Sequence, residues 1–111
     1  MTAAKQFDSL HIIGSVPSGG AERFYSRLVC SLAEAGHRTL AVNQAGSAVS
    51  QQIGAVANQE HVRMRGVWDR FARWRLARLV DKTRPKIVQT YMGRATRIYR
   101  TPSDSSAVHV A

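Results

Sequence analysis

The chain has 111 residues, a formal net charge of +9 at pH 7 and one cysteine, and 44% of its residues are hydrophobic. This length fits one domain at most, the hydrophobic fraction is that of a folded protein, and a single cysteine excludes an intrachain disulfide. The first ten residues contain no long apolar run, and the uncharged stretch 39–59 has too many Asn, Gln and Ser residues to span a membrane, so we expect a soluble, cytoplasmic chain.

The predicted elements of the first half alternate between strands and helices. Leu10–Ile13 is an apolar run typical of a buried strand, and a loop rich in Gly, Ser and Pro follows it. From Ala21 the pattern becomes helical, and Gly36 is expected to end the helix in a left-handed conformation. The pattern predicts a buried stripe on this helix that consists of Ala21, Phe24, Leu28, Leu32 and Ala35, with Tyr25 at its edge. Further along, it predicts a strand at Thr39–Asn43, a short helix at Ser47–Val56 and a strand at Glu60–Met64.

The second half continues the same alternation. Val67–Arg84 has a strong helical pattern that ends before Pro85, and its predicted buried stripe consists of Trp68, Phe71, Ala72, Leu76 and Leu79, with Val80 at the margin. The pattern then predicts a strand at Ile87–Tyr91, a short helix at Gly93–Arg100 and a strand at Ala107–Val110. This order predicts an α/β fold, with a Rossmann-like parallel sheet of four or five strands and helices on both faces. Because the chain stops within or just after a strand, we expect residues 1–111 to be an incomplete domain of a longer protein.

The loop after the first predicted strand runs directly into the first helix. Ligands of open α/β sheets bind at the carboxyl ends of the strands, where a helix N-terminus favours an anion, and Gly19 and Gly20 leave room for a phosphate. A P-loop would need a Lys-Ser or Lys-Thr pair where the chain has Gly20 and Ala21. A dinucleotide site would need an acid where the second strand ends in Asn43. ATP hydrolysis and NAD chemistry are therefore disfavoured, and an anion site and a plain turn both remain open.

Four blocks of residues occur in a characteristic order. They are His11–Gly14 (H-I-I-G), Gly19–Glu22 (G-G-A-E), Leu32–His37 (L-A-x-x-G-H) and Val88–Ala95 (V-Q-T-Y-M-G-R-A). In this order they resemble the opening of the family 4 glycosyltransferases, which have V-V-x-T-H followed by M-x-R-A in the last block. The resemblance implies that residues 1–111 are the N-terminal, acceptor-side half of a GT-B fold, without the C-terminal donor-binding domain and its E-x7-E motif. It also implies that the complete enzyme transfers a sugar from a nucleotide sugar to a lipid-linked acceptor or a cell-envelope glycan, with no metal or other cofactor, and that this fragment is inactive alone.

The resemblance further implies a set of site residues. The residues near the donor diphosphate would be Gly19, Gly20, Ala21 and Glu22. Thr90 and Tyr91 would face the same cleft on the acceptor side, and Arg94 would either contact an anionic acceptor or be a solvated surface charge. Tyr91 stands where the family often has His, and a phenol is a poor base near neutral pH. No catalytic residue is therefore assigned.

The positive charge is concentrated in the second half of the chain. Residues 1–60 carry four basic and four acidic side chains, whereas residues 61–111 carry twelve basic side chains and three Asp. This distribution predicts an anionic partner, which is a nucleic acid, an anionic lipid or a phosphorylated substrate. Trp74 lies off the predicted stripe, between Arg70 and Arg78. The three residues form either a solvated basic face with guanidinium groups stacked on the indole or an anchor on an anionic membrane surface.

The alternative to a transferase is a non-catalytic Rossmann-like module that binds nucleic acid or another polyanion through the basic half. The sequence has no helix-turn-helix or ribonucleoprotein motif, so we expect a nucleotide sugar and a glycan or lipid-linked acceptor as partners rather than nucleic acid. The four histidines are scattered and none pairs at i, i+4, so the sequence predicts no zinc site.

Overall fold

The computed structural model describes residues 7–14, 19–66, 69–99 and 107–110, apart from the side chain of Arg94. Five parallel strands form one sheet in the order β3-β2-β1-β4-β5. The strands are β1 (Ser9–Ile13), β2 (Thr39–Asn43), β3 (Asn58–His61), β4 (Ile87–Tyr91) and β5 (Val108–Val110). The helices are α1 (Gly20–Glu34), α2 (Ala48–Ile53), α3 (Arg70–Thr83) and α4 (Met92–Ile98). The predicted α/β, Rossmann-like parallel sheet is confirmed.

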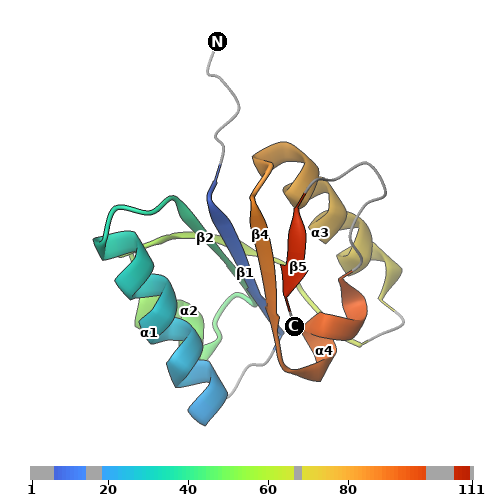
Figure 1. Ribbon diagram of the computed structural model, residues 1–111. Coiled ribbons are helices and arrows are strands. Elements are labelled where there is room, and N and C mark those ends of the chain that lie inside the picture. Colours follow the sequence, from blue (N-terminus) through green and yellow to red (C-terminus); the bar gives the residue numbers. More distant parts are fainter. Residues whose placement is uncertain (1–6, 15–18, 67–68, 100–106, 111) are drawn as a thin grey trace.

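The sheet lies between two layers of helices. Figure 1 shows α1 and α2 on one side of the sheet and α3 and α4 on the other. Successive side chains of a strand point to opposite faces, so β1 contributes Leu10 and Ile12 to the core beneath α3 and α4, and Ile13 to the core beneath α1 and α2. Burial on both faces explains why the strands appear in the sequence as continuous apolar runs.

The end of α1 follows the predicted pattern. Gly36 has a φ of 90°, which is left-handed, and the N–H groups of Gly36 and His37 donate to the carbonyls of Ala33 and Leu32 at 3.1 and 3.0 Å. This pair of bonds is a Schellman motif, which satisfies two carbonyls at the helix end and turns the chain towards β2.

The buried face of α1 differs from the predicted stripe. Its buried residues are Glu22, Tyr25, Ser26 and Val29, whereas the side chain of Phe24 is 58% exposed. The helix is oriented by hydrogen bonds that an apolar pattern does not reveal, because the Tyr25 hydroxyl donates to the carbonyls of His11 and Val42 at 2.9 and 3.2 Å. The prediction that Phe24 is a core residue was therefore wrong.

The long helix α3 also has a different buried face. Asp69 caps its first turn by accepting a hydrogen bond from the Ala72 N–H at 3.0 Å, so the helix begins at Arg70 rather than at Val67. The side chains that face the sheet are Ala72, Leu76, Val80 and Thr83. The predicted stripe was wrong at Phe71, which is 62% exposed because it lies about 100° around the helix from Ala72. The predicted contribution of Trp68 lies outside the described residues.

Three shorter elements are shifted relative to their predicted bounds. The third strand spans Asn58–His61 rather than Glu60–Met64, and the buried side chains of Val62 and Met64 follow it. The short helix α2 ends at Ile53, because Gly54 adopts a positive φ of 54°. The fourth helix begins at Met92 and ends at Ile98, so it starts one residue early and stops before the predicted end.

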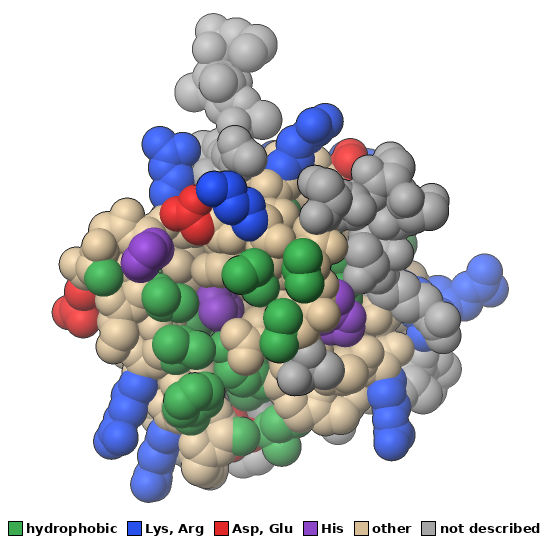
Figure 2. All heavy atoms as spheres, viewed as in Figure 1, with side chains coloured by type: hydrophobic (Ala, Val, Ile, Leu, Met, Phe, Trp, Pro, Cys, Tyr) green, Lys and Arg blue, Asp and Glu red, His purple; other side chains and the backbone are tan. Residues whose placement is uncertain are grey.

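The two edges of the sheet differ in polarity. The β3 edge carries the polar sequence N-Q-E-H, which opposes pairing with another strand, whereas Val108 and Val110 of β5 are 59% and 41% exposed. Ile87 pairs with Val108, and strand alternation places Ile87, Val108 and Val110 on the same side of the sheet as α1. Figure 2 shows hydrophobic side chains gathered over the middle of the molecule in the view in which β5 is in front.

The observed buried face of α3 predicts how two substitutions change the stability of the protein. Leu76→Ala removes a fully buried side chain and is expected to lower the free energy of unfolding by about 2–5 kcal/mol. Phe71→Ala removes an exposed ring and is expected to change it by less than about 0.5 kcal/mol. Urea denaturation followed by circular dichroism measures both values. A larger loss for Phe71→Ala than for Leu76→Ala would restore the predicted stripe and contradict the observed face.

Candidate functional site

The carboxyl edge of the sheet is the candidate binding edge. The chain runs from β1 outwards to β2 and β3, and then returns to pair β4 with the other side of β1. This reversal is a topological switch point, where the connections after β1 and β4 diverge to opposite faces of the sheet. In Figure 1 the start of α1 and the start of α4 lie at this edge.

The predicted phosphate-side residues meet at the start of α1. Gly19 is the N-cap, with extended backbone angles and no capping side chain. The carboxylate of Glu22 folds back towards it, since a Cβ at position 19 would lie 2.7 Å from Glu22 Oε1. Among the described residues, no atom outside the adjacent residues and the backbone of α1 lies within 4 Å of a Cβ on Gly20, and Ala21 is exposed. Glu22 already supplies the negative charge that a helix N-terminus attracts.

Tyr91 lies beneath α1 rather than in an open cleft. Its ring makes an edge contact with Tyr25, with centroids 4.9 Å apart, and its hydroxyl lies 2.8 Å from His11 Nδ1. Only 8% of Tyr91 is exposed, and this burial raises the pKa of its hydroxyl to about 12. The phenol is therefore neutral near pH 7, and its hydroxyl is bonded within the protein.

Thr90 points to the opposite side of the sheet from Tyr91. Its Oγ1 lies 2.8 Å from Thr96 Oγ1 and 3.0 Å from His109 Nε2. The prediction that Thr90 and Tyr91 face the same cleft was wrong, because adjacent residues of a strand point to opposite faces. Arg94 lies within α4, and its side chain is outside the described residues.

The turn between β4 and α4 is strained. Met92 has a φ of 68°, which is unusual for a residue with a side chain, and it is the first residue after β4 at the switch point. Backbone strain of this kind costs on the order of 1–3 kcal/mol and tends to occur at functional sites. Sequence patterns gave no signal for it, because Met has no preference for the left-handed region.

His11 is a buried polar residue whose surroundings the sequence did not reveal. Its Nε2 lies 2.9 Å from Ser9 Oγ, which lies 3.3 Å from Thr39 Oγ1, so a chain of hydrogen bonds runs from Thr39 to Tyr91. Burial lowers the pKa of His11 from 6.5 to about 4, so its imidazole is neutral near pH 7. No local pattern would have identified this pair, because His11 and Tyr91 are 80 residues apart in sequence.

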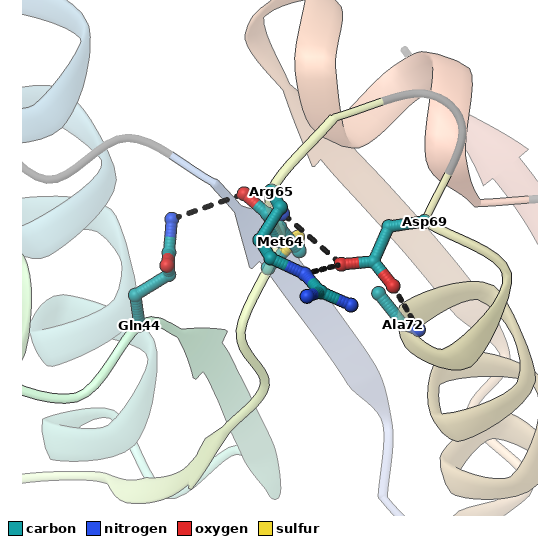
Figure 3. A network of polar contacts seen from close by, with 5 residues as sticks. All are labelled: Gln44, Met64, Arg65, Asp69 and Ala72. Atoms are coloured by element: carbon teal, nitrogen blue, oxygen red, sulfur yellow. Dashed lines mark hydrogen bonds and ion pairs between the residues drawn. The ribbon is translucent and has the colours of Figure 1, made fainter.

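The segment after β3 adds a cation at the same edge, as Figure 3 shows. The Gln44 amide donates to the carbonyls of Gly14 and Met64, which joins this segment to the end of β1. Both the backbone N–H and Nε of Arg65 donate to Asp69 Oδ2, at 3.2 and 3.1 Å. The bond from the Ala72 N–H and the Arg65 side chain lower the pKa of Asp69 to about 2. Sequence reasoning missed Arg65, because it lies in an irregular segment before α3, where no helical spacing relates it to Asp69.

The predicted membrane-surface residues lie on α3, apart from the switch point. Trp74 is 53% exposed, and the guanidinium carbon of Arg78 lies 5.1 Å from the centroid of its ring. The predicted stacking of a guanidinium group on Trp74 is therefore confirmed for Arg78. Arg70 is exposed in the first turn of α3. Beside Trp74 lies the ring of Phe71, with centroids 5.8 Å apart.

Within the described residues, no three His, Cys, Asp or Glu side chains are grouped closely enough to hold a metal ion. No helix in the described part of the chain has the length and apolar character needed to cross a bilayer. The chain matches no family model, and neither the curated proteins nor the solved structures contain a match.

The buried imidazole predicts a pH dependence of stability. As the pH falls from 6.5 to about 4, the unfolded chain binds a proton at His11 and the folded chain does not. The free energy of unfolding is therefore expected to fall over this range by up to about 3 kcal/mol. Above the pKa of His in the unfolded chain, it is expected not to depend on His11. Urea denaturation at a series of pH values measures the slope, and His11→Gln is expected to flatten it. An unchanged slope in His11→Gln would show that other groups cause the dependence; His109, whose pKa is also lowered by burial, is the first to test.

Proposed function

We propose that this chain is the acceptor-side domain of a GT-B glycosyltransferase that transfers a sugar from a nucleotide sugar to a glycan or lipid-linked acceptor. The observation that carries the proposal is the position of Gly20, which is the first residue of α1 at the carboxyl edge of the sheet, where a Cβ would meet no side chain of the described residues within 4 Å. The order of the blocks H-I-I-G, G-G-A-E, L-A-x-x-G-H and V-Q-T-Y-M-G-R-A supports it as a resemblance. The proposed enzyme is cytoplasmic and makes peripheral contact with an anionic membrane.

In the proposed site, α1 presents backbone rather than side chains to the donor. The N–H groups of the first turn of a helix have no partner within the helix, and a diphosphate beside Gly20 would accept hydrogen bonds from them. The Glu22 carboxylate opposes this, because it places a negative charge at the same helix end. A cation is therefore needed nearby, and the half-exposed side chain of Arg65 is the described basic group that the Gln44 contacts bring to this edge.

In the proposed site, a group other than Tyr91 must activate the acceptor. A general base must lie close to the hydroxyl whose proton it accepts, and its pKa must be near the working pH. The Tyr91 hydroxyl instead contacts His11, and its pKa of about 12 keeps it protonated. We therefore assign Tyr91 and His11 to holding the end of β4 against α1, which fixes the position of the turn between β4 and α4.

A second candidate function is a non-catalytic module that binds a polyanion. The exposed aromatic and basic side chains on the outer surface of α3 favour it, since an exposed tryptophan beside arginine is a common contact for anionic partners. In this case the carboxyl edge would have no ligand, and mutations at Gly20 would have no effect on function.

The coding sequence downstream of residue 111 separates the two candidates. The transferase predicts a continuation of about 200 or more residues that includes a second α/β domain with an E-x7-E motif. The module predicts a stop codon directly after Ala111. If the continuation is present, the longer protein is expected to consume a nucleotide sugar, measured by the release of nucleoside diphosphate, and the 111-residue chain alone is expected to release none.

Substitution at Gly20 tests whether the start of α1 binds the donor. In the longer protein, Gly20→Val is expected to lower kcat/KM at least tenfold, because its side chain would occupy the space through which a phosphate approaches the helix N–H groups. The melting temperature is expected to change little, since among the described residues no atom outside the adjacent residues and the backbone of α1 lies within 4 Å of the new Cβ. Ser31→Val on the exposed side of α1 is the matched control. Full activity in Gly20→Val would indicate that this segment is a plain turn that does not bind the donor.

A further inference from the structure

The outer surface of α3 combines exposed aromatic rings with positive charge. We define the α3 outer face as Phe71, Trp74, Arg75, Arg78 and Lys82. Phe71, Trp74, Arg78 and Lys82 are exposed on the side of the helix away from Ala72, Leu76 and Val80, which pack on the sheet, and Arg75 lies at the edge of this side, partly buried. Phe71 and Trp74 are 62% and 53% exposed, so two large rings lie side by side in solvent. Such a pair is costly to leave in water, and a partner that buries it would recover part of that cost.

The charges on this face indicate an anionic partner. Arg75, Arg78 and Lys82 lie within two turns of the rings, and Arg70 lies in the turn before Trp74. Asp81 is exposed on the same side of the helix, seven residues after Trp74, so the cations of this side outnumber its acids, while Asp69 is buried as the N-cap. The face therefore carries net positive charge together with apolar rings, as in helices that lie on anionic bilayers.

The geometry favours a bilayer surface over a nucleic acid. Single-stranded nucleic acids stack their bases on open aromatic faces, but the Arg78 guanidinium already lies over the Trp74 ring, 5.1 Å from its centroid. Beside the helix is a groove of about 590 Å³ that Trp74, Arg75, Arg78 and Lys82 line together with Glu60 and Asp81. Its charge is therefore mixed, whereas a nucleic acid strand lying along it would need a continuous run of cations. The rings project from a helix surface, so a headgroup layer can receive them without a matching cavity.

We infer that the α3 outer face docks this protein on a membrane surface rich in anionic phospholipid, with Phe71 and Trp74 at the level of the headgroups and Arg75, Arg78 and Lys82 on lipid phosphates. The inference names the surface that the proposed peripheral contact would use, but it needs no sugar transfer to hold. The interaction depends on both components, because aromatic rings supply burial and cations supply attraction to the anionic surface.

Vesicle co-sedimentation of the 111-residue chain tests this inference. The probes are vesicles of phosphatidylcholine alone and of phosphatidylcholine and phosphatidylglycerol in equal amounts, each at low and high salt. Binding is expected only with phosphatidylglycerol, and it is expected to weaken with salt because the charges are screened. Arg78→Glu reverses one charge and is expected to weaken binding roughly 30-fold. Trp74→Ala and Phe71→Ala are each expected to weaken it by about tenfold or more.

Two variants of α1 serve as matched controls. Arg27→Glu makes the same change in net charge at another exposed position, and Phe24→Ala removes another exposed ring, which is 58% exposed. Both are expected to bind vesicles within about threefold of the unchanged chain, since each lies outside the α3 outer face. Circular dichroism confirms that each variant is folded.

Three outcomes would overturn the inference. One is the absence of vesicle binding at low salt. Another is an equal loss in Arg27→Glu and Arg78→Glu, which would mean that net charge acts without a defined face. The third is tighter binding to a single-stranded oligonucleotide than to anionic vesicles, with Trp74→Ala weakening only the former. Because no sugar donor is present, none of these outcomes bears on the proposed transferase activity.

Discussion

The arrangement of the molecule depends on the pairing of β1 with two parallel neighbours. All five residues of β1 are in register with β4 and four of them with β2, so the backbone of this strand is satisfied on both sides. Parallel pairing brings the carboxyl ends of β1, β2 and β4 to one edge, together with the helices and loops that follow them. The candidate site is therefore a consequence of backbone hydrogen bonding around one strand, and its side chains come from segments that are distant in sequence.

A buried polar seam then fixes α1 to this sheet. The Tyr25 hydroxyl reaches the backbone of β1 and β2, and its ring packs against Tyr91 of β4. Below it, His11 connects Tyr91 to Ser9 through its two ring nitrogens. Burial of polar groups is tolerated here because each has a partner, and the same burial keeps both His11 and Tyr91 uncharged. The seam thus positions the start of α1, but it contributes no base to the switch point.

The molecule presents two separate surfaces with different chemistry. The carboxyl edge offers backbone N–H groups, a glycine whose Cβ position meets no described side chain within 4 Å, and a half-exposed arginine held by a buried carboxylate. The outer surface of α3 offers large rings and several cations on one helix. The first arrangement is suited to a small, defined ligand that approaches a backbone, whereas the second is suited to an extended, charged surface. A protein that acts on an acceptor at a membrane would use both, since one binds the reactants and the other keeps the protein where the acceptor is.

The sequence by itself determined the order of elements and the sheet type, because strand and helix periodicities and their Gly and Pro boundaries are local properties. Thr39–Asn43 and Ile87–Tyr91 were predicted at their observed bounds, and Gly36 ends α1 as its backbone freedom suggested. Only the tertiary structure decided which side of each helix is buried. In α1 the Tyr25 hydroxyl bonds to the backbones of β1 and β2, and in α3 the side of the helix that packs on the sheet carries Ala72, Leu76 and Val80. The contacts of His11 with Tyr91, of Thr90 with His109 and of Gln44 with the Met64 carbonyl were likewise beyond local patterns. They join residues from different strands and loops. Sequence periodicity describes how a residue relates to its neighbours along the chain, not to residues that the sheet places beside it.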